Sequence, residues 1–298
     1  MSEAIIKKAK ELGFIEVGFS TPREPLYFEE FKSWVSAHKN AGMSWLERSL
    51  NLRENPSLLL KGCRTIISLA YPYSSHKPET TDGLTASRYS KPDQDDYHYR
   101  LKALCSELVR MLRDMEKGCN NRICIDSAPV LERSLAHSAG IGFIGKNNML
   151  IIPGYGSYFY LAEILTTVPL DIMPIKQIEN SCDSCMLCIE ACPSGALEKP
   201  FCLDASKCLS YLTIEYKARV SEADGRNMGD CFFGCDRCQE VCPFNGSERR
   251  RDTLLPSADK FLIMDNDYFL KSFGKTAFAR AGFEKIKTNI QVIKRART

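Results

Sequence analysis

Two short runs of cysteine carry the clearest chemistry in this sequence. They read Cys182-x2-Cys185-x2-Cys188-x3-Cys192-Pro193 and Cys235-x2-Cys238-x3-Cys242-Pro243. Three thiolates on one tight turn can reach three corners of a single cubane, while the fourth cysteine opens a short helix that faces away and ligates the other cluster of a pair. The spacing therefore predicts two [4Fe–4S] clusters, which would transfer single electrons.

This arrangement, the bacterial-type ferredoxin signature, also predicts which cysteines share a cluster. The ligands expected for the first cluster are Cys182, Cys185, Cys188 and, from the second run, Cys242. The ligands expected for the second cluster are Cys192, Cys235, Cys238 and one further cysteine.

The fourth ligand of the second cluster must come from outside the two runs. Cys231 lies four residues before Cys235 rather than three, so the second run is shorter than an ideal half of the motif. We assign the missing ligand to Cys208, and Cys202 and Cys231 are the alternatives.

Other uses of cysteine are weaker alternatives. Cys-x2-Cys pairs also occur in structural zinc sites, but both runs end in Cys-x3-Cys-Pro, which favours iron–sulfur clusters. No signal peptide is expected, because Met1–Lys10 carries three lysines and no apolar run. Fourteen cysteines in such a chain indicate reduced thiols, metal binding and a cytoplasmic location rather than a disulfide framework. The scattered cysteines are interpreted as small buried apolar residues: Cys63, Cys105, Cys119 and Cys124.

Composition and charge limit the remaining classes of protein. The chain has 298 residues, of which 44% are hydrophobic and 26% are charged, as in an ordinary globular protein. No run of apolar residues is long enough for a transmembrane helix. Residues 251–298 carry ten Lys and Arg against five Asp and Glu. This basic segment could contact a phosphate backbone, although charge alone favours a solvated helical face.

Helical and strand-like patterns alternate along the first 175 residues. Apolar spacing predicts helices at Ser2–Leu12, Pro25–His38, Leu101–Met115 and Val130–Ala139. Short apolar runs predict strands at Phe14–Phe19, Thr65–Tyr71, Arg122–Ile125, Met149–Ile152 and Ser157–Thr167. Alternation of this kind implies a layered α/β domain. The fold class expected is therefore mixed α+β and α/β, with a layered α/β domain at 1–175, a ferredoxin-like domain at 176–250 and a short helical segment at 251–298.

Two local features of the first domain could belong to a site. Asp126 follows a predicted strand in Asp126-Ser-Ala-Pro129, where its carboxylate could face a cleft or could only cap a turn. The segment Gly140–Asn148 contains three glycines in a Gly-x-Gly-x-x-Gly pattern. A dinucleotide loop needs a strand before it and a helix after it, whereas here a helix precedes and a strand follows. Such a turn instead lets the backbone approach a large flat cofactor or another chain closely.

The order of these motifs resembles the epoxyqueuosine reductase family. The motifs that carry the resemblance are Asp126-Ser-Ala-Pro-Val-Leu-Glu-Arg133, Ala139-Gly-Ile-Gly-Phe-Ile-Gly-Lys-Asn-Asn148, Gly156-Ser-Tyr-Phe-Tyr-Leu-Ala-Glu-Ile-Leu-Thr-Thr167, Cys182–Pro193, Cys208-Leu-Ser-Tyr-Leu-Thr-Ile-Glu215 and Phe233–Asn245. The resemblance implies a cobalamin-binding first domain related to reductive dehalogenases. It also implies that epoxyqueuosine in a tRNA anticodon loop is reduced to queuosine with loss of water. It supports Cys208 as the eighth cluster ligand.

The resemblance also implies roles for single residues. Asp126 would donate the proton, and a raised pKa would suit that task. The residues expected near cobalamin are Arg53, Lys146, Asn147, Leu150, Gly156 and Ser157, each of which could instead be a turn or packing residue. None of the four histidines lies in an Asp-x-His-x-x-Gly run, so no histidine ligand to cobalt is expected. We also expect tRNA as the substrate and an external one-electron donor such as a flavodoxin or ferredoxin. A monomeric state and no association with a membrane are expected as well.

Two departures from the family pattern affect substrate recognition. The family pattern Tyr-x-x-Gly-x-Asp-Tyr-His is replaced by a longer segment without glycine, Tyr89–His98. Many relatives continue into C-terminal helical repeats, whereas this chain offers one repeat-like unit at Asp267–Ile293, and we therefore expect weaker, salt-dependent tRNA binding. The basic residues expected to contact phosphate are Lys285, Lys287, Lys294, Arg295 and Arg297. The competing hypothesis is a related corrinoid and iron–sulfur reductase, or an electron-transfer ferredoxin protein, that acts on a small molecule.

Overall fold

The chain forms two compact units in the computed structural model, which describes residues 1–172, 178–246 and 250–297. Unit 1 comprises Met1–His38, Ser44–Pro72 and His98–Asp183, and unit 2 comprises Lys39–Met43, Tyr73–Tyr97 and Ser184–Thr298. The units therefore differ from the three consecutive domains expected from the sequence, because residues 39–43 and 73–97 belong with the C-terminal part. The expected boundary at residues 175 and 176 lies outside the described residues.

Unit 1 is built on a four-stranded sheet in the order β1-β2-β8-β5. Its strands are β1 (Glu16–Ser20), β2 (Thr65–Pro72), β8 (Phe159–Thr166) and β5 (Asn121–Cys124). All neighbouring strands are antiparallel. The strand predictions are confirmed to within a few residues, since β2 and β8 are almost entirely buried and therefore read as apolar runs.

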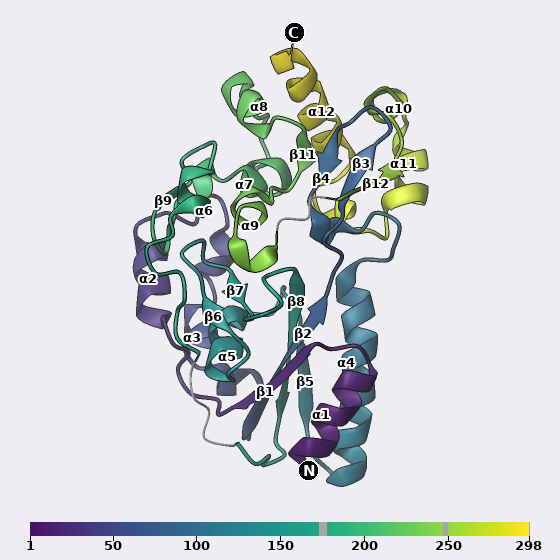
Figure 1. The fold of residues 1–298 in the computed structure, drawn as a ribbon. Helices are drawn as coiled ribbons and strands as arrows, with labels where there is room; N and C mark the ends of the chain where they lie inside the picture. Colours follow the sequence, from purple (N-terminus) through teal and green to yellow (C-terminus); the bar gives the residue numbers. More distant parts are fainter. Residues whose placement is uncertain (173–177, 247–249, 298) are drawn as a thin grey trace. The chain divides into compact units, whose positions relative to one another are not determined.

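Helices cover both faces of this sheet, as the layered α/β prediction requires. Helices α1 (Ser2–Glu11) and α4 (Tyr97–Met115) lie on one side, and α5 (Glu132–Ser138) lies on the other (Figure 1). The end of α5 approaches β1 so closely that a Cβ on Gly18 would stand 2.2 Å from the carbonyl oxygen of Ala139. Only glycine therefore fits at position 18.

Shorter elements complete unit 1. They are α2 (Phe28–Ser36), α3 (Leu50–Glu54), β6 (Phe143–Ile144) and β7 (Leu150–Ile151). The antiparallel pair β6 and β7 follows α5 through a glycine-containing turn, so the prediction that a helix precedes this segment and a strand follows it is confirmed.

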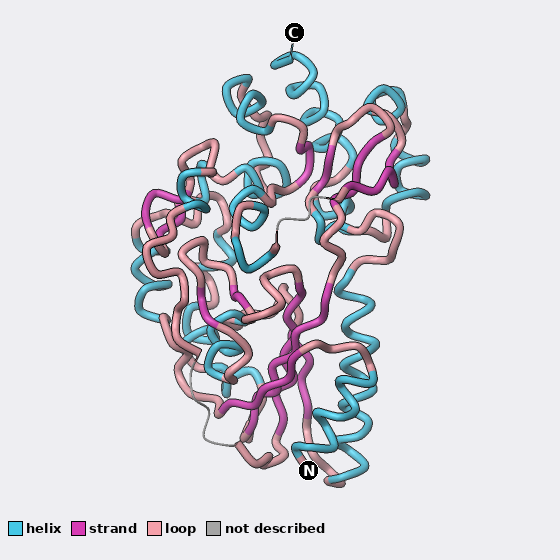
Figure 2. Tube along the Cα trace, in the orientation of Figure 1, coloured by secondary structure: helices cyan, strands magenta, loops and turns pink. Residues whose placement is uncertain are grey.

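Unit 2 contains a second four-stranded sheet, in the order β11-β4-β3-β12 (Figure 2). Its strands are β3 (Lys77–Thr80), β4 (Thr85–Ala86), β11 (Cys231–Phe233) and β12 (Arg251–Leu255). The central strands β3 and β4 are antiparallel to each other, and each pairs in parallel with a strand from the C-terminal half of the chain. A small antiparallel pair, β9 (Leu197–Lys199) and β10 (Cys202–Leu203), lies apart from this sheet.

The helices of unit 2 are α6 (Leu187–Glu190), α7 (Leu209–Ile214), α8 (Glu222–Met228), α9 (Arg237–Glu240), α10 (Ala258–Ile263), α11 (Asn266–Phe273) and α12 (Phe283–Arg297). Short 3-10 helices in the two units occupy Ser44–Leu46, Pro56–Leu59, Arg88–Ser90, Ala205–Lys207, Pro243–Asn245 and Ala277–Arg280. The C-terminal helices share one aromatic core with β11, in which Phe278 contacts the rings of Phe232, Phe233 and Phe273. No helix in the described part of the chain has the length and hydrophobicity needed to cross a membrane.

Candidate functional site

The cysteines of both runs lie in short helices or in the turns beside them. Cys188 lies in α6 and Cys192 just after it, while Cys235 precedes α9 and Cys238 lies within it. Cys208 is the N-cap residue of α7. None of the fourteen cysteines, all of which lie in the described ranges, forms a disulfide bond. Helices of one turn separated by tight turns thus present thiols in the way that cubane clusters require.

Four of these thiols are close enough to influence one another electrostatically. Burial raises the pKa of Cys235 to about 12, and the neighbouring Cys208 contributes to the rise. Burial also raises the pKa of Cys238, with contributions from Cys235 and Cys208. Cys192 contributes in the same way to the pKa of Cys208. Cys208 is therefore a neighbour of the three other ligands expected for the second cluster.

The two alternatives to Cys208 have other surroundings. The thiol of Cys202 lies 3.1 Å from the ammonium group of Lys39 and 3.7 Å from a carboxylate oxygen of Glu198. Cys231 is also a neighbour of Cys235, but it lies in β11 and its thiol donates to the carbonyl oxygens of Phe233 and Gly234. No group of three or more His, Cys, Asp or Glu side chains in the described ranges has the arrangement of a single-metal site.

A buried ion network holds α9, the helix that carries Cys238. The Arg88 guanidinium lies 3.1 Å from Asp236 and 2.6 Å from Glu240, and Lys77 lies 3.0 Å from Glu240. The backbone N–H of Arg88 donates to the same Asp236 oxygen at 2.9 Å. Although burial opposes ionisation, Lys77 and Arg88 hold the pKa of Glu240 at about 2. The network therefore fixes Asp236, which lies between Cys235 and Cys238, and Glu240, which follows Cys238 in α9.

Asp126 lies on an exposed turn between β5 and α5. Its side chain is 61% exposed, and one carboxylate oxygen lies 3.4 Å from Nε2 of His98 in α4. Its φ of +49° is in the left-handed region, which Asp adopts more readily than most residues. Its backbone N–H donates to Oε1 of Glu132 at 2.5 Å. The Asp126 carboxylate is thus presented to solvent by a turn that two neighbouring side chains contact.

The residues expected near cobalamin all lie in unit 1 but differ in exposure. Arg53 is buried in α3, where Nη1 donates to the carbonyl oxygen of Val130 at 3.1 Å. Asn147 and Leu150 are also buried, and Lys146 donates to the carbonyl oxygen of Asp183. The remaining two are Gly156, which has a φ of +98°, and the buried Ser157. The structure therefore gives Arg53, Asn147 and Lys146 contacts within the protein itself.

Comparison with known proteins identifies the family. The family model for epoxyqueuosine reductase QueG, DUF1730, matches residues 53–127, and a 4Fe-4S double cluster binding domain matches residues 181–245. An epoxyqueuosine reductase of Cyclobacterium marinum is 31% identical over 98% of this chain and 96% of its own. This chain belongs to the epoxyqueuosine reductase family. The predicted resemblance is thereby confirmed, and so is the presence of iron–sulfur clusters.

Two solved structures of epoxyqueuosine reductases have the same fold. One was determined with an epoxyqueuosine-modified tRNA stem loop and has a TM-score of 0.87 and 30% identity, covering 98% of this chain and 80% of that chain. The other, from Bacillus subtilis, has its catalytic aspartate loop swung out of the active site. It has a TM-score of 0.86 and 29% identity, with the same coverage.

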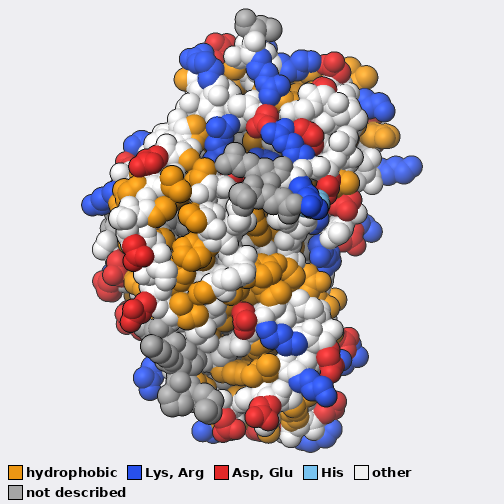
Figure 3. Space-filling model, viewed as in Figure 1, with side chains coloured by type: hydrophobic (Ala, Val, Ile, Leu, Met, Phe, Trp, Pro, Cys, Tyr) orange, Lys and Arg blue, Asp and Glu red, His pale blue; other side chains and the backbone are white. Residues whose placement is uncertain are grey.

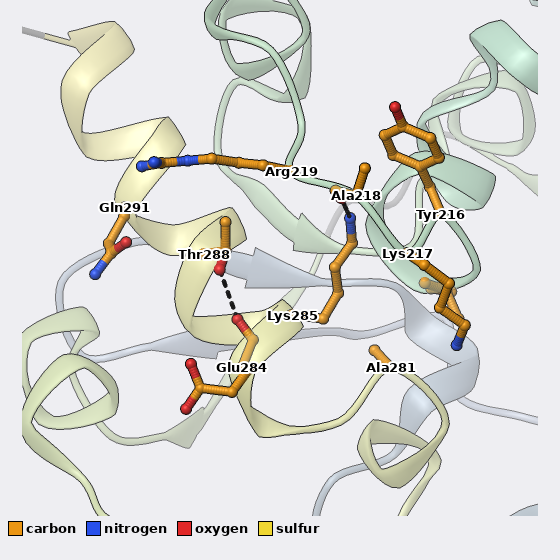
Figure 4. A pocket seen from close by; sticks show the side chains of 10 residues that line it. Tyr216, Lys217, Ala218, Arg219, Ala281, Glu284, Lys285, Thr288 and Gln291 are labelled. Atoms are coloured by element: carbon orange, nitrogen blue, oxygen red, sulfur yellow. Dashed lines mark hydrogen bonds between the residues drawn. The ribbon is translucent and has the colours of Figure 1, made fainter.

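This member of the epoxyqueuosine reductase family also has a basic pocket in unit 2, which brings Lys285, expected from sequence to contact phosphate, together with Lys217 and Arg219, which were not. The pocket has a volume of about 370 Å³ and lies between the segment after α7 and helix α12 (Figure 4). Its lining includes Lys217, Arg219 and Lys285, and the ammonium group of Lys285 lies 5.2 Å from the ring centre of Tyr216. Burial and the like charge of Lys217 lower the pKa of Lys285 to about 8. A bound anion would relieve this repulsion.

Two glutamates of this epoxyqueuosine reductase family member were also missed from sequence. Glu132 contacts the Asp126 turn from α5, and Glu163 lies fully buried in β8. The sequence could have indicated Glu163 by its place in the apolar run Phe159–Thr166. A glutamate is almost never fully buried in such a run without a partner.

Proposed function

We propose that this protein reduces epoxyqueuosine to queuosine in the anticodon loop of tRNA, with Asp126 as the proton donor. The observation that carries the proposal is the similarity to epoxyqueuosine reductases over 98% of the chain. The Asp126 turn agrees with it, because a catalytic aspartate loop moves in the Bacillus subtilis relative. A similar reductase binds an epoxyqueuosine-modified tRNA stem loop, which supports the same substrate here.

The cysteines would hold two clusters that pass single electrons from an external donor such as a flavodoxin or ferredoxin. The set Cys192, Cys208, Cys235 and Cys238 is supported by the place of Cys208 beside the other three thiols; Cys231 lies beside Cys235 as well, and Cys188 beside Cys238. The set Cys182, Cys185, Cys188 and Cys242 follows from their spacing. A thiolate set of this kind suits iron–sulfur clusters, because thiolates are soft ligands.

Cobalamin fits the donors that unit 1 leaves unsatisfied. Nε of Arg53 and Nδ2 of Asn148 are buried and have no hydrogen-bond partner among the described residues. Amide carbonyl groups around the rim of a corrin could accept from such donors. Arg53, Lys146, Asn147, Leu150, Gly156 and Ser157 would hold the cofactor. Bound there, cobalamin would supply the low-potential electrons that the reaction needs.

Asp126 would supply a proton to the oxygen that leaves. Removing an epoxide oxygen as water, with formation of a carbon–carbon double bond, consumes two electrons and two protons. A carboxylic acid within hydrogen-bond reach of the leaving oxygen typically accelerates this step by a factor of about 10² to 10⁴. His98, 3.4 Å from the carboxylate, would orient it toward the substrate.

The basic pocket of unit 2 would contact the tRNA backbone. Lys217, Arg219 and Lys285 line it together with the carboxylate of Glu284, and Lys285 also donates to the carbonyl oxygen of Ala218, so its net positive charge favours a phosphate group. Lys294, Arg295 and Arg297 follow in the last turn of α12, around which Figure 3 shows further basic side chains. Because phosphate contacts release counterions, binding of tRNA should weaken steeply with salt.

The decisive experiment compares tRNA digests with and without the protein. Deletion of the gene should remove queuosine from tRNA and accumulate its epoxide, and the wild-type gene should restore queuosine. The Asp126→Asn variant should retain its iron and its corrinoid absorption band but lose turnover by at least about 10²-fold. Full activity of this variant would refute the assignment of Asp126, and unchanged queuosine in the deletion strain would refute the proposed substrate.

A further inference from the structure

A carboxyl group is buried in the middle of the sheet of unit 1. Glu163 in β8 has no exposed surface, and its cross-strand neighbours are Ser68 in β2 and Cys124 in β5. Neither carboxyl oxygen of Glu163 meets a hydrogen-bond partner in the described part of the chain, and neither does the hydroxyl of Ser68. A charged carboxylate without partners at such a site is costly, so Glu163 should carry a proton.

A second carboxyl group, Glu132, lies beside it at the start of α5. Burial raises the pKa of Glu163 well above its ordinary value, and the charge of Glu132 raises it further. Glu132 itself is half-buried, and desolvation followed by the charge of Asp126 raises its pKa to about 8. Two adjacent carboxyl groups with little water between them cannot both ionise near neutral pH.

The charged neighbours are distributed unequally between the two carboxyl groups. Near Glu132, the positive charge of Arg133 and the imidazole of His98 favour ionisation, and Arg53 also interacts with this carboxylate. The titratable neighbours of Glu163 on α4 and β5 are the thiols Cys105 and Cys124, whose pKa values burial raises to about 12. Near neutral pH these thiols are uncharged. As the pH rises, Glu132 therefore ionises before Glu163, which keeps its proton.

Glu132 also contacts the Asp126 turn. Its Oε1 accepts the backbone N–H of Asp126 at 2.5 Å, and this hydrogen bond strengthens once Glu132 is ionised. The same hydrogen bond holds Asp126 at its positive φ.

We propose that Glu132 is a positioning residue for the Asp126 turn and that Glu163 is a buried carboxyl group that stays protonated. The role of Glu132 in catalysis rests on the proposed function, in which Asp126 delivers a proton. The protonation of Glu163 does not depend on that function, because it follows from its burial in β8 without a hydrogen-bond partner among the described residues.

The protonation of Glu163 can be tested by infrared spectroscopy of the protein without substrate or cofactor. At neutral pH the wild-type protein should show the carbonyl stretch of a protonated carboxylic acid. Glu163→Gln should weaken this band, whereas Glu107→Gln, which changes an exposed carboxylate on α4, should leave it unchanged. Absence of the band from the wild-type protein at neutral pH would overturn the proposal, and so would an unchanged band in Glu163→Gln. If Glu163→Gln does not fold, Glu132→Gln gives a second route, because the band that remains in that variant should come from Glu163, and its absence would overturn the proposal.

The positioning role can be tested by kinetics. Glu132→Leu removes the acceptor of the Asp126 N–H and should lower kcat by about 10²-fold with little change in KM, since misplacement by about 1 Å costs this much. Glu132→Gln keeps an acceptor oxygen and should restore most of kcat. An unchanged kcat in Glu132→Leu would refute the positioning role. If Asp126→Asn stays active, the proposed function fails while the infrared result still decides whether Glu163 is protonated.

Discussion

Replacement of Arg88 by methionine tests whether the buried ion network determines the stability of unit 2. Arg88 is 3% exposed and neutralises Asp236, which is 4% exposed, and Glu240. Methionine preserves most of the length of the side chain but removes the charge and all its donors. Asp236, the residue next to Cys235, would stay buried. Of the two cations that lower the pKa of Asp236, only Lys77 would remain.

The expected cost follows from the burial of these groups. Breaking a buried ion pair by removing one partner typically costs about 3–5 kcal/mol. For a chain of this length, that corresponds to a fall in Tm of roughly 10 °C. The matched control is Arg251→Met, because Arg251 also contacts two carboxylates, Glu79 at 2.7 Å and Asp230 at 2.8 Å, but is 46% exposed. Exposed pairs contribute about 0–1 kcal/mol each.

Thermal unfolding of the cluster-free protein, followed by circular dichroism, measures both variants. Iron content after anaerobic preparation should also fall in Arg88→Met, because α9 carries Cys238, and should stay unchanged in the control. If Arg88→Met is no less stable than Arg251→Met, the network does not stabilise the fold. If it loses stability but retains all its iron, the network does not position the cysteines.

Two further predictions concern other buried groups. Glu163→Gln should flatten the dependence of Tm on pH. Because the pKa of Glu163 is raised in the folded state, that state binds more protons than the unfolded one, and the wild-type protein loses stability from about pH 5 upward. The variant lacks this carboxyl group and should not lose stability in this way. An equal slope in both proteins, measured by thermal unfolding from about pH 5 to about pH 9, would contradict this. Gly234→Ala should lower stability by more than about 2 kcal/mol in denaturant titrations, because Gly234 has a φ of +73° and its new Cβ would stand 1.5 Å from Oγ of Ser87. Gly83→Ala is its control, since its φ is similar but no atom lies within 4 Å, and equal losses in the two variants would refute the steric argument.

The helices and strands of unit 1 could be predicted because their burial is simple. One face of α4 is apolar and β2 is buried almost throughout, so periodicity located both elements within a few residues. The sheet of unit 2 could not be predicted. Its strands β3 and β4 are two to four residues long, and they pair with strands that begin 174 and 146 residues further along the chain, since Lys77 pairs with Arg251 and Thr85 with Cys231. Periodicity reports which face is buried and carries no information on such distant partners.

The same difference applies to the candidate site. Cysteine spacing specified the cluster motif, because the ligands of a cubane must lie on short turns at fixed separations. Asp126 could be proposed from its motif, but its contacts with His98 and Glu132 depend on how α4 and α5 meet the sheet. The pairing of Glu132 with Glu163 brings together residues from two elements, and no local pattern indicates it.

The parallel pairing of β3 with β12 and of β4 with β11 affects how the protein must be synthesised. A ribosome releases residues 73–97 well before it makes the strands that flank them, so both central strands must wait with open edges during the translation of more than a hundred residues. Unpaired edges invite association between nascent chains. For the same reason a fragment that begins at residue 184 lacks the middle of its own sheet, and the cysteine-rich half cannot be transplanted as one continuous cassette.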